Sequence, residues 1–134
     1  MKPTSSTSGR CCVPRPEPSI HTRGLDRKRG RPSGRTDYAT DLPGLPDGLA
    51  FDDAGNLFVS CYEPSRILRI DPQGRVVCYA EDPTSHVFCH PTNIAFDGAT
   101  LYTANLGRWH ITKVATDTRA TPVVTRVTAA RSSR

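Results

Sequence analysis

The aspartate of a Pro46-Asp47-Gly48 sequence is the residue of this chain best suited to chemistry. A carboxylate in a loop can bind a hard cation such as Ca²⁺ or Zn²⁺, and it can accept a proton from water. Asn93 follows a similar Pro91-Thr92 sequence, and its amide oxygen also suits a hard cation. Both residues have plainer interpretations, because Asp-Gly commonly closes a hairpin and asparagine often bonds local backbone in a turn. The chemistry therefore depends on how the fold places these two positions.

Both positions belong to an internal repeat. Residues 46–52 are echoed by residues 91–97 at an offset of 45, and residues 57–62 by residues 101–106 at an offset of 44. Repeats of about 40 to 50 residues built from short strands are typical of β-propeller blades. A blade cannot bury its apolar faces alone, so two blades require neighbours. A blade begins at the central channel, which would direct Asp47 into that channel.

Turn sequences divide residues 43–128 into short strands rich in aromatic and β-branched residues. The strands predicted for the first blade are 49–51, 57–62, 66–71 and 76–80. Those predicted for the second are 94–96, 101–105, 110–114 and a weaker one at 122–127. No helix is predicted. The sequence therefore predicts an all-β fold, a partial β-propeller of about two four-stranded antiparallel blades.

Charge separates the ends of the chain from its middle. Residues 1–42 carry a net charge of +5 and have no periodic apolar face, whereas residues 43–115 carry −3. A segment that buries so little apolar surface cannot offset the entropy of ordering it. We therefore predict a disordered basic segment over residues 1–42, two blades over residues 43–128 and a frayed tail over residues 129–134.

The basic segment contains Lys28-Arg29-Gly30-Arg31-Pro32, which resembles the core of an AT-hook. In that motif the arginines, here Arg29 and Arg31, enter the narrow minor groove of A·T-rich DNA. The alternative is chance, since the whole segment is rich in arginine, proline and glycine. In either case a flexible basic segment should bind polyanions weakly and in a salt-dependent way.

The five cysteines show no metal-binding spacing, and an odd number without a disulfide framework favours a reducing compartment. The N-terminus has no apolar signal region, and no run of residues is long and apolar enough to span a membrane. These features predict a cytoplasmic protein without membrane contact.

Three runs of the first repeat resemble a known family: Leu45-Pro46-Asp47-Gly48-Leu49-Ala50-Phe51-Asp52, Gly55-Asn56-Leu57-Phe58-Val59, and Arg66-Ile67-Leu68-Arg69-Ile70-Asp71-Pro72-Gln73-Gly74. Residues 91–96 and Ala104-Asn105-Leu106-Gly107-Arg108-Trp109-His110-Ile111-Thr112 extend the similarity. The family is the senescence-marker protein/gluconolactonase/luciferin-regenerating-enzyme-like family of six-bladed, regucalcin-like β-propellers. The resemblance covers about residues 43–115.

The resemblance implies a divalent metal, Ca²⁺ or Zn²⁺, at the top of the central channel and a lactone as substrate. Family members hold the metal with a glutamate, two asparagines and the aspartate of a Pro-Asp-Gly turn. Asp47 matches that aspartate and would also be the catalytic base, while Asn93 is a possible channel-lining residue. The glutamate and the two asparagines would precede Leu45, where residues 1–42 have no match.

The sequence therefore predicts a truncated lactonase-like protein that is inactive as this fragment. One alternative is a non-catalytic binding or structural module, and another is a DNA-binding, AT-hook-like segment on a degenerate propeller. Two blades without ring closure cannot cover Phe51, Phe58, Ile67 and Ile94 together, so self-association is expected.

Overall fold

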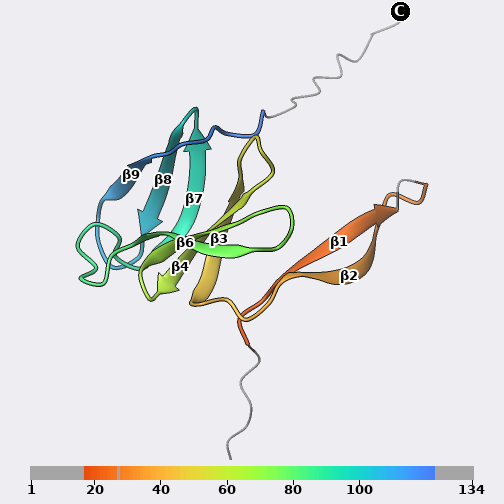
Figure 1. Ribbon diagram of the computed structural model, residues 1–134, viewed down its shortest axis with the longest axis horizontal. Helices are drawn as coiled ribbons and strands as arrows, with labels where there is room; N and C mark the ends of the chain where they lie inside the picture. The colour runs from red at the N-terminus through yellow and green to blue at the C-terminus, as the bar shows by residue number, and fades with distance from the viewer. Residues whose placement is uncertain (1–16, 27, 123–134) are drawn as a thin grey trace, which may run out of the picture.

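The computed structural model describes residues 17–26 and 28–122, which form three antiparallel β-sheets. No helix occurs among these residues, and hence none that could cross a membrane. A hairpin of β1 and β2 projects from a body made of a four-stranded sheet (β3–β6, blade 1) and a three-stranded sheet (β7–β9, blade 2) (Figure 1). The strands are β1 Ile20–Asp26, β2 Arg31–Ala39, β3 Leu45–Phe51, β4 Leu57–Glu63, β5 Arg66–Ile70, β6 Val76–Glu81, β7 Pro91–Asp97, β8 Thr100–Asn105 and β9 Ile111–Ala115.

Blade 1 confirms the predicted four-stranded antiparallel sheet, with its strands paired in chain order. Two of its hairpins use the same Asp-x-x-Gly turn. Gly55 N–H donates to the Asp52 carbonyl and Gly74 N–H to the Asp71 carbonyl, at 3.2 and 2.9 Å. Both glycines have φ of +83°, a conformation that side chains disfavour. The turn chemistry read from the sequence therefore sets the hairpin register.

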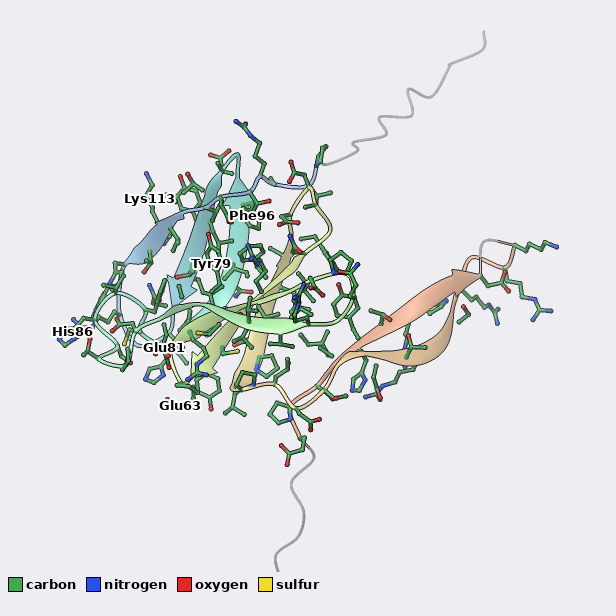
Figure 2. All side chains as sticks on the ribbon, viewed as in Figure 1. Glu63, Tyr79, Glu81, His86, Phe96 and Lys113 are labelled. Atoms are coloured by element: carbon green, nitrogen blue, oxygen red, sulfur yellow. The ribbon has the colours of Figure 1, made fainter. Side chains whose placement is uncertain are left out.

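The two blades pack face to face around Phe58. Alternate side chains of β4 point to opposite faces, so Phe58 turns toward blade 2 while its neighbours turn away. Phe58 and Ile67 are fully buried there, against a cluster completed by Phe88, Ile94 and Leu101. The Phe58 ring also meets Tyr79 and Phe96, both labelled in Figure 2, edge to face at centroid distances of 5.0 and 5.1 Å. Two blades were expected to leave some of four apolar side chains uncovered. Three of them, Phe58, Ile67 and Ile94, are buried, and Phe51 is half exposed.

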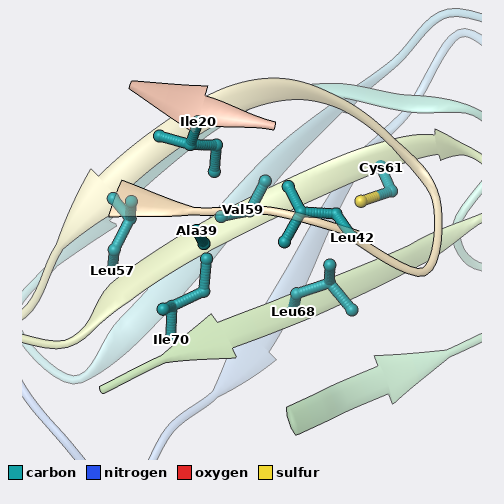
Figure 3. Close-up of a cluster of buried hydrophobic side chains, with 8 residues drawn as sticks. All are labelled: Ile20, Ala39, Leu42, Leu57, Val59, Cys61, Leu68 and Ile70. Atoms are coloured by element: carbon teal, nitrogen blue, oxygen red, sulfur yellow. The ribbon is translucent and has the colours of Figure 1, made fainter. Parts of the chain in front are cut away.

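A second core lies on the opposite face of blade 1 (Figure 3). Leu57, Val59 and Leu68 are buried on this face. Their cover comes from Ile20 and Ala39 at the base of the β1–β2 hairpin and from Leu42, which follows it. This face is therefore closed by residues that precede the predicted start of the fold at residue 43.

Strands β1 and β2 correct the prediction that residues 1–42 are disordered. Asp26 begins the connecting turn, where its side chain accepts hydrogen bonds from the backbone N–H groups of Lys28 and Arg29. Most hairpin side chains are exposed, which explains why no apolar face was visible in the sequence. Its order comes from backbone pairing and from the buried base, both of which a search for apolar periodicity misses. Residues 1–16 of that prediction lie outside the described residues.

Blade 2 has three paired strands within the described part of the chain. The predicted fourth strand, 122–127, lies almost wholly outside it, as does the predicted tail at 129–134. Residues 116–121 cross instead to the β3–β4 turn of blade 1. There Asp53 N–H donates to the Arg119 carbonyl at 2.9 Å, and Ala120 forms a bridge with Asp52. This crossing ties the two blades together at one end.

Candidate functional site

Asp47 lies in a bulge of β3. Pro46 pairs with Cys61 and Leu49 with Val59, so four residues of β3 span three of β4. A bulge leaves its extra residue outside the regular pairing and re-aims the local side chains. The Asp47 side chain is exposed, whereas Gly48 beside it is buried. The Pro-Asp-Gly sequence therefore presents an exposed carboxylate on β3, the first strand of the blade 1 sheet.

Gly48 lets the first strands of the two blades meet. A Cβ atom at this position would lie 2.5 Å from the Thr92 carbonyl oxygen and 2.7 Å from Asn93 Cα. Ser60 joins the same strands: its hydroxyl accepts the Gly48 N–H at 3.0 Å and donates to the Thr92 carbonyl at 2.9 Å. The buried Ser60 side chain is thus a bridge between β3 and β7.

Asn93 lies in the equivalent bulge of β7. Pro91 pairs with Asn105 and Asn93 with Ala104, so Thr92 is the extra residue. The Asn93 side chain is exposed, and it borders a shallow, mostly apolar depression of about 200 Å³ on blade 2. Because Gly48 lies against Asn93 Cα, Asp47 and Asn93 come from adjoining parts of two neighbouring strands. The structure therefore brings the two predicted positions into one region.

These residues do not complete a metal site by themselves. A hard cation such as Ca²⁺ takes about six to eight oxygen ligands, usually with several carboxylates. Among residues 17–26 and 28–122 no three His, Cys, Asp or Glu side chains gather closely enough to hold a metal ion. Asp47 and Asn93 offer one carboxylate and one amide. The described residues thus provide one side of such a site and not the whole of it.

Two other carboxylates, Asp52 and Asp82, stabilise loops through hydrogen bonds. Asp52 follows β3; burial opposes its ionisation, but hydrogen bonds from Asn56 and Thr118 outweigh burial and lower its pKa. Asp82 begins the loop that leads to β7. A hydrogen bond from the Thr84 hydroxyl, followed by backbone N–H groups that include Val87, lowers the pKa of Asp82. Both carboxylates are occupied in holding loops, so neither is free to act as a base.

His90, His110 and Cys61 are held by structural contacts or by burial. The His110 Nε2 atom lies 3.0 Å from the Val87 carbonyl, and His90 Nδ1 lies 2.8 Å from the Tyr62 carbonyl. Cys61 is buried, and that burial raises the pKa of its thiol to about 11. A thiol with such a pKa is neither a nucleophile nor a ready metal ligand at neutral pH.

Arg29 and Arg31 lie at the tip of the β1–β2 hairpin. Arg29 is in the turn, with its backbone N–H bonded to the Asp26 carboxylate, and Arg31 opens β2 opposite Asp26. An AT-hook binds as an extended chain, so a turn between these arginines does not match that motif. Their side chains are nevertheless exposed, as are those of Arg23 and Arg35, which face each other across the strands.

A comparison with known protein families matches the hairpin, blade 1 and the first two strands of blade 2. The family model described as the SMP-30/Gluconolactonase/LRE-like region matches residues 16–106, which is more than half of the chain. The chain belongs to this family. The match begins at residue 16, so it includes the β1–β2 hairpin, and it ends at residue 106, before the end of the predicted resemblance at residue 115.

Individual relatives share part of their sequence with this chain. The chain is 36% identical over 77 residues to 6-deoxy-6-sulfogluconolactonase of Pseudomonas putida, covering 55% of this chain and 25% of the relative. It is 42% identical over 55 residues to regucalcin of Danio rerio, covering 40% of this chain and 17% of regucalcin. The chain thus spans at most about a quarter of the length of these two relatives.

A solved structure of a luciferin-regenerating enzyme shares the fold, with a TM-score of 0.59 and 22% identity. The superposition covers 78% of this chain and 40% of the enzyme. This similarity confirms the all-β, partial-propeller architecture. The roles of two residues that hold the inner strands together were not predicted from the sequence. Gly48 allows β3 to contact β7, and Ser60 bridges the two strands by hydrogen bonds. Gly48 was visible as part of the Pro-Asp-Gly motif, but Ser60 sits in a strand with no distinguishing signal.

Proposed function

We propose that this chain is part of a sugar-lactone hydrolase and that Asp47 is its general base and a ligand of its divalent cation, Ca²⁺ or Zn²⁺. Membership of the gluconolactonase family and the names of the relatives support the substrate class. The observation that carries the proposal is the bulge of β3, which presents an exposed Asp47 beside β7 while Gly48 closes against that strand.

In the proposed reaction the Asp47 carboxylate takes a proton from the water that attacks the lactone carbonyl carbon. The bond between that carbon and the ring oxygen breaks, and the ring oxygen receives the proton that Asp47 took from the water, which yields the open hydroxy acid. The cation, when bound, would polarise the carbonyl. Asn93 lies beside this position and would orient the substrate or its water through the side-chain amide. We also propose that the protein acts in the cytoplasm.

The 134-residue chain by itself should not be catalytic, since Asp47 and Asn93 alone leave a cation mostly hydrated. We expect purified protein to hydrolyse gluconolactone no faster than buffer does when Ca²⁺, Zn²⁺ or Mn²⁺ is added. Asp47→Ala should change nothing in this assay. Metal-dependent turnover that disappears in Asp47→Ala would show that other ligands complete the site, for example from a second copy of the chain.

A chimera tests the role of Asp47 directly. Residues 16–106 would replace the matching segment of the P. putida sulfogluconolactonase, whose other blades would supply the rest of the site. The chimera should hydrolyse the lactone, and Asp47→Ala should lower kcat by at least about 100-fold, in line with loss of a general base. Asp97→Ala, at another exposed aspartate ending a first strand, is the matched control. Equal activity of the two variants would refute the assignment.

The hairpin supports a second candidate function, weak polyanion binding. Among the described residues of β1–β2 and its turn, five basic side chains are exposed, namely Arg23, Lys28, Arg29, Arg31 and Arg35. Arg23 and Arg35 are directly opposed, an unfavourable pair that an anion would relieve. Binding to duplex DNA should weaken steeply with salt, and Arg23→Ala with Arg35→Ala should reduce the salt slope by about 2. Salt-independent binding, or none at low salt, would exclude this function.

A further inference from the structure

A serine, a histidine and an aspartate form a hydrogen-bonded chain near the base of the β1–β2 hairpin. His21 Nδ1 lies 2.7 Å from Asp37 Oδ1, and His21 Nε2 lies 3.0 Å from Ser19 Oγ. Both distances fall in the range of about 2.6–3.2 Å that joins a nucleophile to its base and the base to an orienting group. A Ser-His-Asp constellation is recognised by this geometry and not by its fold or its order in the chain. The three side chains therefore meet the geometric requirement for a nucleophilic site.

Strand geometry explains why these three residues meet. Alternate residues of an extended chain share a face, so Ser19 and His21 lie on one face while Ile20 between them turns into the second core. Pairing of β1 with β2 places His21 directly opposite Asp37. The register shifts between Ile20 and His21, which makes Tyr38 the extra residue of a bulge beside the site. Two residues of one strand and one residue of its partner thus supply the whole constellation.

The base of the hairpin holds the serine in place. Ile20 and Ala39, shown in Figure 3, are buried against blade 1. On the other side of Ser19, the Pro18 carbonyl accepts a hydrogen bond from the Leu42 N–H at 3.1 Å. Ser19 therefore lies between two anchored residues, which limits the freedom of its hydroxyl relative to the histidine.

The two contacts of His21 also set its tautomer. An ionised carboxylate can only accept hydrogen bonds, so the His21 Nδ1 atom carries the hydrogen that Asp37 accepts. In the neutral ring Nε2 then has a free lone pair, to which the Ser19 hydroxyl donates. The His21 and Asp37 side chains are 29% and 64% exposed, and Ser19 is half-buried. Solvent therefore weakens the contact between the imidazole and the carboxylate, and a reaction at this site should be slow.

We propose that Ser19, His21 and Asp37 form a second site, which transfers the acyl group of a small carboxylic ester to the Ser19 oxygen. As Ser19 Oγ bonds to the carbonyl carbon, its proton passes to His21 Nε2. The bond from that carbon to the leaving oxygen then breaks, and the leaving oxygen receives this proton. Water next attacks the acyl carbon and gives a proton to His21, which returns it to Ser19 Oγ as the acid departs. Asp37 is a positioning residue, and none of the three belongs to the site proposed for lactones.

An activated ester, 4-nitrophenyl acetate, tests the proposal because its nitrophenolate leaves readily even from an exposed site. The purified 134-residue protein should release nitrophenolate faster than buffer does, and mass spectrometry after a short incubation should find an acetyl group on Ser19. Ser19→Ala and His21→Gln should each lower the rate above buffer by at least about tenfold, as expected for loss of a nucleophile or its base. EDTA should not change this rate, which separates the reaction from metal-dependent lactone hydrolysis.

Two further substitutions separate a positioning role from a structural one. Asp37→Asn should lower the rate by about threefold or more, because the charge that favours the reactive tautomer is lost, and Asp37→Glu should recover part of that loss. Thr22→Ala is the matched control, since it removes a neighbouring β1 hydroxyl that bonds Thr36 and no histidine. It should react like wild type, and all variants should keep the wild-type circular dichroism spectrum.

Three results would overturn the proposal. The first is wild-type protein that reacts no faster than buffer. The second is Ser19→Ala that reacts like wild type, which would mean that His21 or surface amines attack the ester directly. The third is a loss of rate in Thr22→Ala as large as that in Ser19→Ala.

Discussion

Blades 1 and 2 have similar sequences and matching strand registers but different surroundings. Ile67 is fully buried in blade 1, whereas its counterpart Ile111 is 66% exposed. Both blades form antiparallel strands that pair in chain order. The comparison teaches that local sequence builds a blade, while burial of its faces depends on the neighbour that packs against it.

The inner strands show the same contrast at the candidate site. Blade 1 has a glycine, Gly48, at the position where blade 2 has an asparagine, Asn93. The two positions have different surroundings. Gly48 is pressed against the Thr92 and Asn93 backbone, which leaves no room for a side chain. Asn93 is exposed, so its position has room for a side chain. The asymmetry gives the site an aspartate on one strand and an amide on the next.

The largest expected effect comes from Phe58→Ala. This substitution removes a fully buried ring from the contact between the blades, and it should lower the free energy of unfolding by about 3–5 kcal/mol. Tyr102→Ala, at the equivalent position of blade 2, should cost about 1 kcal/mol or less, because this side chain is partly exposed. Urea denaturation at low protein concentration measures both. Equal losses would mean that the two faces are covered alike in solution.

Gly48→Ala should have an intermediate effect. Its methyl group would lie 2.5 Å from the Thr92 carbonyl oxygen, so β3 and β7 must separate, at a cost of about 1–3 kcal/mol. Asn93→Ala, at the equivalent position in blade 2, should change stability by no more than about 0.5 kcal/mol. Thermal unfolding of both variants checks the difference. A neutral Gly48→Ala would contradict the close approach of the two strands.

Much of this fold was accessible from the sequence. The repeat and the Asp-x-x-Gly turns predicted blade 1 and most of blade 2, because turn residues and strand propensity act over a few residues. The β1–β2 hairpin was not accessible in this way. Its strands are mostly polar, and it contacts the core through Ile20, Tyr38 and Ala39 at its base, so its order depends on partners distant in sequence.

The smallest expected effect is the loss, at low pH, of the stability that Asp52 contributes to the fold. Its lowered pKa means that the folded chain holds the carboxylate ionised more strongly than the unfolded chain does. The stability that it contributes, about 1 kcal/mol, is therefore complete above about pH 4 and is lost as pH falls through the folded pKa. The difference in unfolding free energy between wild type and Asp52→Asn should shrink below about pH 4. Asp97→Asn, an exposed counterpart, is the control, and a pH-independent difference for Asp52→Asn would contradict the assignment.

The sequence by itself determined the strands of the two blades, their turns, the family and the identity of Asp47 as the candidate base, since each depends on residue types at short spacing. The tertiary structure decided which side chains are buried, that Gly48 and Ser60 join the inner strands, and that Asp47 and Asn93 share a region. It also decided that β1 and β2 pair and that Ile111 is 66% exposed. These properties arise from contacts between residues distant in sequence, and burial depends on every neighbour at once.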